Sequence, residues 1–349
     1  MKIGILTWYY AFNYGARAHS YALYKIIQEM GHECVMIAYH PSYAIQSNID
    51  VSFGFSNRKR HPILVLRSLN RCRKFFNDEK RFCKTRTVKS ASEIDALGLD
   101  AIILGSDEVF NLQHPCFSKI YYGVGIINTP CFSYAPSAGQ VSADTVLNPE
   151  IINSLRHMKA ISVRDENTKK LIENNIACKV KIVSDPTLLY DFSDIRKSFP
   201  VKNYLLIYAF DVYNDYRKQI EDYAKNNGMK IVSLLNRISW ADYSMDMADF
   251  ETWVSAFHNA KIVVTDSFHG LVFSIKSKKD FVIIKRGDKV NKIDGLLEQL
   301  GIVKPYYKGE SIEGYIREKI DYKRVEERLD RIKCDSIEYI KSSLAKVKG

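Results

Sequence analysis

The sequence predicts an α/β protein built from two Rossmann-like domains with parallel sheets. Short apolar runs alternate with segments of helical periodicity, a pattern typical of parallel strands joined by helical crossovers. The alternation stops at a polar stretch, residues 191–202, and then restarts. The chain has 349 residues, which is too long for one ordinary hydrophobic core. These observations indicate two domains with a linker between them.

The first predicted domain, residues 1–190, begins directly with an apolar strand. Its predicted strands are residues 2–7, 33–39, 100–105, 131–134, 160–163 and 179–183. Its predicted helices are residues 16–30, 62–83 and 166–174. The last strand runs into Asp185-Pro186, and we expect the proline to end it.

The second predicted domain covers residues 202–310, and a helical tail covers residues 311–349. The predicted strands of this domain are residues 204–210, 230–235, 261–265 and 281–285. Its predicted helices are residues 214–227, residues 250–258 and a segment that follows Gly270. Apolar residues recur at helical spacing over 322–346, which predicts an amphipathic closing helix.

The composition is that of a globular protein kept in a reducing compartment. Hydrophobic residues make up 46% of the chain and charged residues 26%, which excludes general disorder. The first residues lack the apolar core of a signal peptide, and no run approaches the roughly 20 apolar residues that span a bilayer. The chain has seven cysteines, an odd number, and no two of them form a C-x-x-C pair. We therefore expect a cytoplasmic protein without disulfides.

The formal net charge of +11 is concentrated in residues 58–89. This segment holds twelve Lys or Arg residues against Asp78 and Glu79, a net charge of +10. Such a segment favours an anionic partner, although a basic helix with a solvated face is an equally simple interpretation. Nucleic acid is a rival partner because Phe75, Phe76 and Phe82 interleave with the charges. No nucleic-acid-binding motif accompanies them, so we expect no nucleic-acid partner.

Polar residues gather where the predicted strands end, and ligands of open parallel sheets bind at that edge. In the first domain these residues are Asn13, Tyr14, Gly15, Asp107, Asn111, Ser137 and Arg164. In the second domain they are Asp266, Ser267, His269, Gly270, Lys285 and Arg286. The histidines show no metal-binding spacing, and neither a G-x-G-x-x-G nor a Walker motif occurs. We therefore expect no metal, and dinucleotide and P-loop functions are disfavoured.

Three of these residues have chemistry suited to catalysis or anion binding. His269 begins a helix, where it can protonate a substrate, or it can serve as a cap or a packed residue. Arg164 can bind a carboxylate or phosphate, or it can pair with Asp165 or Glu166. Asp107 can accept a proton from a sugar hydroxyl group, or it can cap a helix. The residues alone leave these alternatives open.

Several short motifs, in this order, resemble those of the polysaccharide pyruvyl transferase family. They follow Asn13-Tyr14-Gly15 and are Gly105-Ser-Asp-Glu-Val-Phe-Asn111, Ser133-Tyr-Ala-Pro-Ser-Ala-Gly139, Ile161-Ser-Val-Arg-Asp165, Asp185-Pro-Thr-Leu-Leu189 and Thr265-Asp-Ser-Phe-His-Gly-Leu-Val-Phe273. The resemblance implies a glycosyltransferase-B-like pair of domains whose sheets face a cleft. It also implies transfer of pyruvate from phosphoenolpyruvate to a pair of sugar hydroxyl groups as a ketal, in surface or capsular polysaccharide biosynthesis. No cofactor is then required, because phosphoenolpyruvate is a co-substrate.

The resemblance also implies roles for the residues at the strand ends. His269 is the expected general acid and Asp107 the second catalytic candidate. The expected donor-binding residues are Arg164, Ser267, Gly270, Lys285 and Arg286. The expected acceptor-binding residues are Asn13, Tyr14, Gly15, Asn111 and Ser137. Some members of the family carry arginine two residues before the histidine, where this chain has Ser267. We expect either that Lys285 or Arg286 replaces it or that the donor binds differently.

The implied acceptor is a sugar on a lipid diphosphate carrier or on a growing polysaccharide. We therefore expect the enzyme to act at the inner face of the cell membrane, with residues 58–89 on anionic headgroups. A metal-independent glycosyltransferase that uses a nucleotide sugar is the alternative enzyme. It would need the same two domains.

Overall fold

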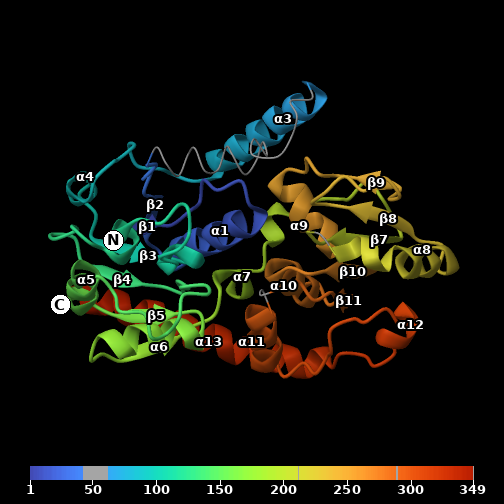
Figure 1. Ribbon diagram of the computed structural model, residues 1–349. Coiled ribbons are helices and arrows are strands. Elements are labelled where there is room, and N and C mark those ends of the chain that lie inside the picture. The colour runs from blue at the N-terminus through green and yellow to red at the C-terminus, as the bar shows by residue number, and fades with distance from the viewer. Residues whose placement is uncertain (42–61, 211, 288–289, 349) are drawn as a thin grey trace. The chain divides into compact units, whose positions relative to one another are not determined.

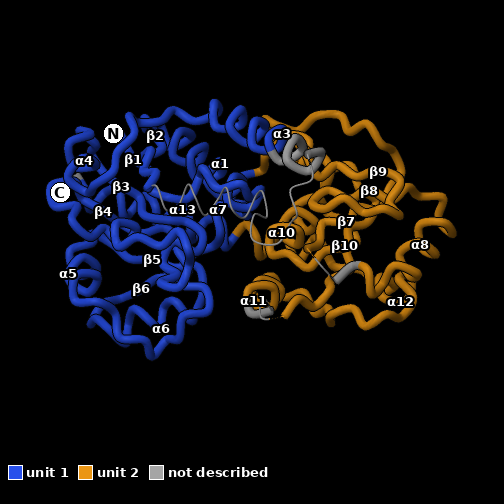
Figure 2. The backbone as a smooth tube through the Cα atoms, turned by 45° about the horizontal axis from the view of Figure 1, so that its top comes forward, with its two compact units in different colours: residues 1–190, 331–349 blue, residues 191–330 orange. Residues whose placement is uncertain are grey.

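The computed structural model describes residues 1–41, 62–210, 212–287 and 290–348. The chain folds into two compact units (Figure 2). Unit 1 comprises Met1–Tyr190 together with Arg331–Gly349, and unit 2 comprises Asp191–Asp330. The tail that we expected at 311–349 is thus divided between the units, because its helix begins in unit 2 and its later turns pack in unit 1.

Unit 1 contains a parallel sheet in the order β2-β1-β3-β4 and a parallel pair β5-β6. The strands are β1 (Lys2–Leu6), β2 (Glu33–Met36), β3 (Ala101–Leu104), β4 (Cys131–Ser133), β5 (Ile161–Val163) and β6 (Val180–Ile182). The β5-β6 pair continues the sheet beside β4. There Lys159 N donates to Cys131 O and the hydroxyl groups of Ser133 and Ser162 bond to the facing backbone.

Several helices of unit 1 follow residues with capping side chains. Asn13 caps α1 (Tyr14–Glu29), Asp165 caps α6 (Glu166–Asn175) and Asp185 caps α7 (Pro186–Leu189), and each oxygen satisfies backbone N–H groups of the first turn. The other helices are α3 (Pro62–Asp78), α4 (Ala91–Asp95), α5 (Pro149–His157) and the later part of α13 (Tyr322–Lys348). Short 3₁₀ turns are η1 (Glu79–Arg81), η2 (Glu108–Phe110) and η3 (Lys119–Tyr122).

Unit 2 contains a parallel sheet in the order β11-β10-β7-β8-β9. The strands are β7 (Tyr204–Tyr208), β8 (Lys230–Ser233), β9 (Tyr243–Ser244), β10 (Ile262–Thr265) and β11 (Asp280–Ile283). The helices are α8 (Arg217–Asn226), α9 (Phe250–Asn259), α10 (Phe268–Lys276), α11 (Val290–Leu300) and α12 (Ile312–Tyr315), with 3₁₀ turns η4 (Ser193–Ile195) and η5 (Val212–Tyr216). The buried rings of Tyr208, Trp253 and Phe273 pack together, and Leu205 and Ile207 belong to a separate buried cluster with α8. Apolar residues therefore cover the sheet on both faces, as parallel sheets require.

The predicted fold class is confirmed, since each unit is an α/β layer structure with a parallel sheet. Differences lie at the ends of elements and in elements that were not predicted, among them α5, α11 and β9. Helix α10 begins at Phe268, before Gly270, because Ser267 caps it. The expected linker 191–202 packs into unit 2, because Phe192, Ile195 and Phe199 are buried there despite their polar neighbours. Figure 1 shows helices lying alongside the strands of each unit. No helix in the described part of the chain is long and apolar enough to cross a membrane.

Candidate functional site

The centre of the site in unit 1 is Arg164, which directly follows β5. Its Nη1 atom lies 2.6 Å from Asp185 Oδ2 and its Nη2 atom lies 3.4 Å from Asp107 Oδ1. The Arg164 side chain is only 7% exposed and the Asp185 side chain is fully buried. Burial favours the neutral form of Arg164, but Asp185 and Asp107 outweigh it and raise its pKa. Arg164 is therefore a fixed cation between two carboxylates.

These partners differ from Asp165 and Glu166, the ion-pair alternatives that the sequence offered. Asp165 Oδ1 instead accepts hydrogen bonds from the backbone and hydroxyl of Thr168 in α6. Asp185 reaches Arg164 because β5 and β6 are adjacent parallel strands, so that residues after their carboxyl ends meet at one edge.

Asp107 follows β3 and lies at the same edge. Its φ of 70° is unusual for a residue with a side chain. The loop is held by Ser137 N, which donates to Asp107 O, and by Arg164 N, which donates to Pro136 O. The Asp107 side chain makes no capping bond to η2 in the structure described, so the capping alternative is wrong. Its carboxylate lies beside Arg164 and is 20% exposed, which leaves it accessible to a substrate.

His19 is a functional candidate that the sequence reasoning missed. It lies in α1 and is completely buried, and its Nε2 atom lies 3.5 Å from Asp107 Oδ2. Neither ring nitrogen has a hydrogen-bond partner within the described residues. Asp107 is thus flanked by Arg164 on one oxygen and by His19 on the other. The sequence does contain an indication of this role, because His19 lies among the apolar residues of the predicted helix 16–30.

The expected acceptor-binding residues have structural roles in unit 1. Asn13 Oδ1 accepts from Gly15 N and Ala16 N and so caps α1. Tyr14 is buried, with its ring centroid 5.0 Å from that of Phe75. Ser137 is buried, and its hydroxyl accepts from Gly139 N. Asn111 is partly exposed, and its amide donates to Glu108 Oε2 and accepts from Gln113 N. Asn13 is exposed, so these two asparagines are the members of the group that a ligand can reach.

The site in unit 2 is the turn from β10 into α10. Thr265 Oγ1 donates to Tyr208 O and accepts from Ser267 N, and Ser267 Oγ accepts from Gly270 N. These bonds fix the backbone on both sides of His269, whose side chain is partly exposed in the first turn of α10. The N-terminus of a helix attracts anions, so this turn joins a titratable side chain to an anion-binding position.

Gly270 permits this turn. A Cβ atom there would lie 2.1 Å from Thr265 Oγ1 and 2.9 Å from Tyr208 Cδ1. The close approach of α10 to β10 therefore requires glycine, and the role of Gly270 in the structure is to bring the helix against the sheet.

The two cations expected after β11 differ in their surroundings. The Arg286 guanidinium carbon lies 4.0 Å from the centroid of the Phe210 ring, and both carboxylate oxygens of Asp266 accept from Phe210 N. Arg286 is therefore held beside the strand that carries the turn of His269. Lys285 is exposed.

The structure thus brings Asp107, Arg164 and Ser137 together in unit 1, and Ser267, His269, Gly270 and Arg286 at one edge of unit 2. The expectation that the two groups face a common cleft stays a prediction. Within the ranges that the structure describes, no three His, Cys, Asp or Glu residues gather as metal ligands.

Comparison with known families gives one match over most of the chain. The family model described as polysaccharide pyruvyl transferase matches residues 13–288, a range that includes both groups of residues. No curated protein matches this chain.

Solved structures resemble the chain in fold. UDP-GlcNAc 2-epimerase from Neisseria meningitidis bound to UDP-GlcNAc is 10% identical, with a TM-score of 0.53 over 99% of this chain and 100% of that chain. UDP-GlcNAc 2-epimerase from Methanocaldococcus jannaschii is 10% identical, with a TM-score of 0.50 over 95% and 93%. At this identity the likeness shows the fold alone, which is the glycosyltransferase-B-like pair of Rossmann domains.

Proposed function

This chain belongs to the polysaccharide pyruvyl transferase family, and we propose that it transfers pyruvate from phosphoenolpyruvate to two hydroxyl groups of a sugar as a ketal. The observation that carries the proposal is the family match over residues 13–288. The geometry of the two groups of residues supports it, because the reaction needs a proton donor, anion-binding groups and a carboxylate.

His269 is the proposed general acid. It protonates the methylene carbon of phosphoenolpyruvate, which becomes a methyl group and leaves an oxocarbenium-like centre at C2. One sugar hydroxyl group adds to C2, phosphate leaves with its bridging oxygen, and the second hydroxyl group closes the ketal. Asp107 accepts one hydroxyl proton and passes it to the departing phosphate, and the other proton returns to the deprotonated His269, so the reaction balances without a redox partner.

The anionic donor requires positive groups. The N-terminus of α10 and the guanidinium of Arg286, held on Phe210, support donor binding beside His269. Lys285 is a further candidate, and these two cations stand in for the arginine that Ser267 replaces. Arg164 is held by Asp107 and Asp185, so a direct contact to the donor would compete with these ion pairs.

Asp107 is the proposed base that orients the attacking hydroxyl group. Arg164 fixes one carboxylate oxygen, and the side chain remains partly exposed. The proposed acceptor is a sugar carried by a lipid diphosphate, in the biosynthesis of a surface polysaccharide. Such an acceptor places the enzyme at the inner face of the membrane.

The test is mass spectrometry of candidate lipid-linked or model glycosides incubated with phosphoenolpyruvate. We expect the mass gain of one pyruvyl ketal, its loss in His269→Ala, and its retention in His258→Ala, a matched control at an exposed histidine of α9. Full activity of His269→Ala would remove His269 from the acid role. Release of nucleotide from a nucleotide sugar, with no consumption of phosphoenolpyruvate, would replace the proposal with glycosyl transfer.

A further inference from the structure

The outward side of α3 combines exposed apolar and cationic side chains. Leu69 is 52% exposed and Phe76 is 58% exposed, and Arg73 and Lys80 are also exposed. The spacing of Leu69, Arg73 and Phe76 places them on one helix face, and Lys80 in η1 continues it. We call these four residues the cationic-apolar face. Neither Arg73 nor Lys80 has an ion-pair partner among the described residues.

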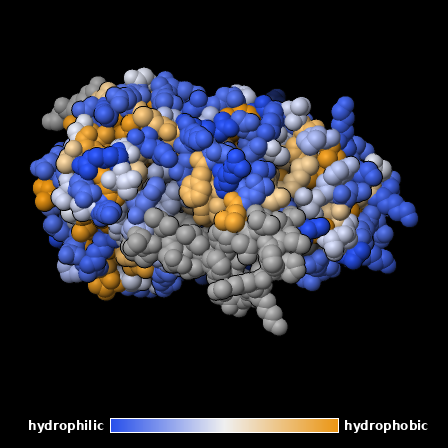
Figure 3. Space-filling view, turned by 90° about the horizontal axis from the view of Figure 1, so that it is seen from above, coloured by the Kyte–Doolittle hydropathy of each residue, from blue (hydrophilic) through white to orange (hydrophobic). Residues whose placement is uncertain are grey.

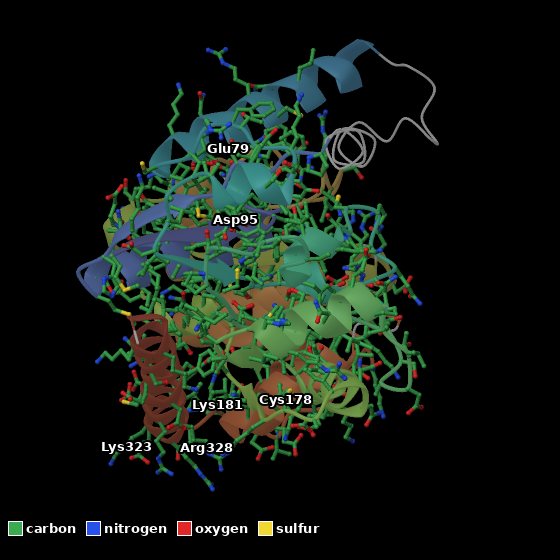
Figure 4. The ribbon with its side chains drawn as sticks, turned by 90° about the vertical axis from the view of Figure 1, so that its left-hand side faces the viewer. Glu79, Asp95, Cys178, Lys181, Lys323 and Arg328 are labelled. Carbon is green, nitrogen blue, oxygen red and sulfur yellow. The ribbon has the colours of Figure 1, made fainter. Side chains whose placement is uncertain are left out.

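The acidic residues of this segment are turned away from that face. Asp78 and Glu79 are buried, and Figure 4 shows Glu79 at the inner side of α3. Glu79 lies 3.1 Å from Lys84 Nζ and 3.8 Å from Arg17 Nη2, and Asp78 lies 3.9 Å from Arg81 Nε. The negative charges are therefore compensated inside the unit, so they do not neutralise the exposed cations.

Buried contacts hold the inner side of α3 against α1. Arg17 of α1 is fully buried and donates to Phe75 O over 3.1 Å. Burial lowers the pKa of Arg17, and Glu79 opposes that change. The exposed position of Leu69 and Phe76 thus follows from the fixed inner contacts of the same helix, and packing within unit 1 leaves them at the surface.

We propose that the cationic-apolar face binds the surface of an anionic lipid bilayer. Apolar side chains enter the boundary of headgroups and acyl chains while Lys and Arg meet the anionic headgroups. A nucleic acid would use Arg73 and Lys80 but would gain little from Leu69. Figure 3 views the molecule from the side on which α3 lies in Figure 1, and it shows hydrophobic residues among hydrophilic ones there.

The face is continuous with the start of α1. The ring of Phe76 lies 5.5 Å from that of Phe12, and Phe12 directly precedes Asn13. Bilayer binding by α3 would therefore bring the carboxyl end of β1 towards the headgroups. Only the link to a lipid-carried acceptor rests on the proposed function, because binding to the bilayer needs neither substrate.

The test is co-sedimentation of the full-length protein with vesicles of phosphatidylglycerol and phosphatidylcholine, compared with phosphatidylcholine alone, without substrates. We expect binding to the anionic vesicles that weakens with salt. It should fall roughly 25-fold or more in Arg73→Glu/Lys80→Glu, since each of the two basic residues contributes about a fivefold factor. Leu69→Ser/Phe76→Ser should also bind less, with its salt dependence retained.

The matched control is Lys159→Glu/Lys170→Glu, which makes the same charge change at exposed residues before β5 and in α6, on the other side of unit 1. It should bind nearly as the unaltered protein does. Unchanged binding of the Arg73/Lys80 variant would overturn the proposal, as would absence of binding in the unaltered protein. A shift of DNA or RNA mobility that the variant loses, without vesicle binding, would assign the face to nucleic acid.

Measurement of pyruvyl transfer to a water-soluble glycoside distinguishes a failure of the bilayer-binding proposal from a failure of the proposed reaction. The Arg73/Lys80 variant should keep that activity while it loses vesicle binding. If the unaltered protein binds vesicles but transfers no pyruvate, the proposed reaction fails and the surface proposal stands.

Discussion

Replacement of Gly270 by alanine should displace α10 from β10. The new Cβ atom would lie 2.1 Å from Thr265 Oγ1 and 3.0 Å from Thr265 Cβ, and Thr265 is fully buried. Thr265 has little freedom to move, because its hydroxyl donates to Tyr208 O over 2.7 Å and accepts from Ser267 N over 3.1 Å. The alanine therefore either moves the helix or breaks these bonds.

The expected loss of stability follows from these two alternatives. An additional methyl group in a packed interior costs about 1–3 kcal/mol, and loss of one buried hydrogen bond adds about 1 kcal/mol. We therefore expect Gly270→Ala to lower the free energy of unfolding of unit 2 by about 2–4 kcal/mol. Pyruvyl transfer should fall as well, because the adjacent His269 moves with the helix.

Urea unfolding followed by tryptophan fluorescence measures this change. Trp253 is a local probe, since its ring centroid lies 4.6 Å from that of Phe273 in α10. The control is Gly295→Ala in α11, where a Cβ atom meets no described atom within 4 Å and alanine should stabilise the helix by up to about 1 kcal/mol. An unchanged midpoint for Gly270→Ala, with the control behaving as expected, would refute the close-approach argument.

Two further predictions concern buried and hydrogen-bonded carboxylates in unit 1. Asp185→Asn should lower the free energy of unfolding by roughly 3 kcal/mol, because Arg164 loses the carboxylate at 2.6 Å while its charge stays buried. If the urea unfolding midpoint of Asp185→Asn equals that of the wild type, Asp107 alone compensates the charge of Arg164. Asp95, labelled in Figure 4, has a lowered pKa: burial opposes ionisation, but the N–H groups of residues 127–129 outweigh it. Such a carboxylate adds stability above its unfolded pKa and loses it as pH falls through its folded pKa. The difference in free energy of unfolding between the wild type and Asp95→Asn should therefore have its full value at neutral pH and decrease below about pH 4. A difference that stays constant down to about pH 3 would contradict this account.

The strands and the location of the candidate residues could be predicted from the sequence. Runs such as Ala101–Leu104 and Ile262–Thr265 are apolar at every position or nearly so, which is the pattern of strands buried on both faces. Because ligands of parallel sheets bind beyond the carboxyl ends, the polar residues after these runs became the site candidates. An apolar run and the polar residues that follow it are neighbours in the sequence, so these candidates could be identified without knowledge of the tertiary structure.

The partners of these residues were not predictable in the same way. Arg164 has acidic neighbours in sequence, yet it pairs with Asp185 and Asp107, which lie 21 and 57 residues away. The choice depends on which strands are adjacent in the sheet. His19 was missed for the same reason, since its contact with Asp107 depends on how α1 packs against the loop after β3.

The sequence by itself therefore determined the main strands of both sheets and the longer helices α1, α3, α6, α8, α9, α10 and α13. It also determined the edge at which the chemistry lies and the family to which the chain belongs. Only the tertiary structure decided that Asp107 caps no helix but binds Arg164, that residues 191–202 pack into unit 2, and that Asp78 and Glu79 turn inward from α3. The physical reason is that hydrophobic periodicity is recorded within a few neighbouring residues. The partner of a buried charge is fixed by segments that meet only when the sheet has formed.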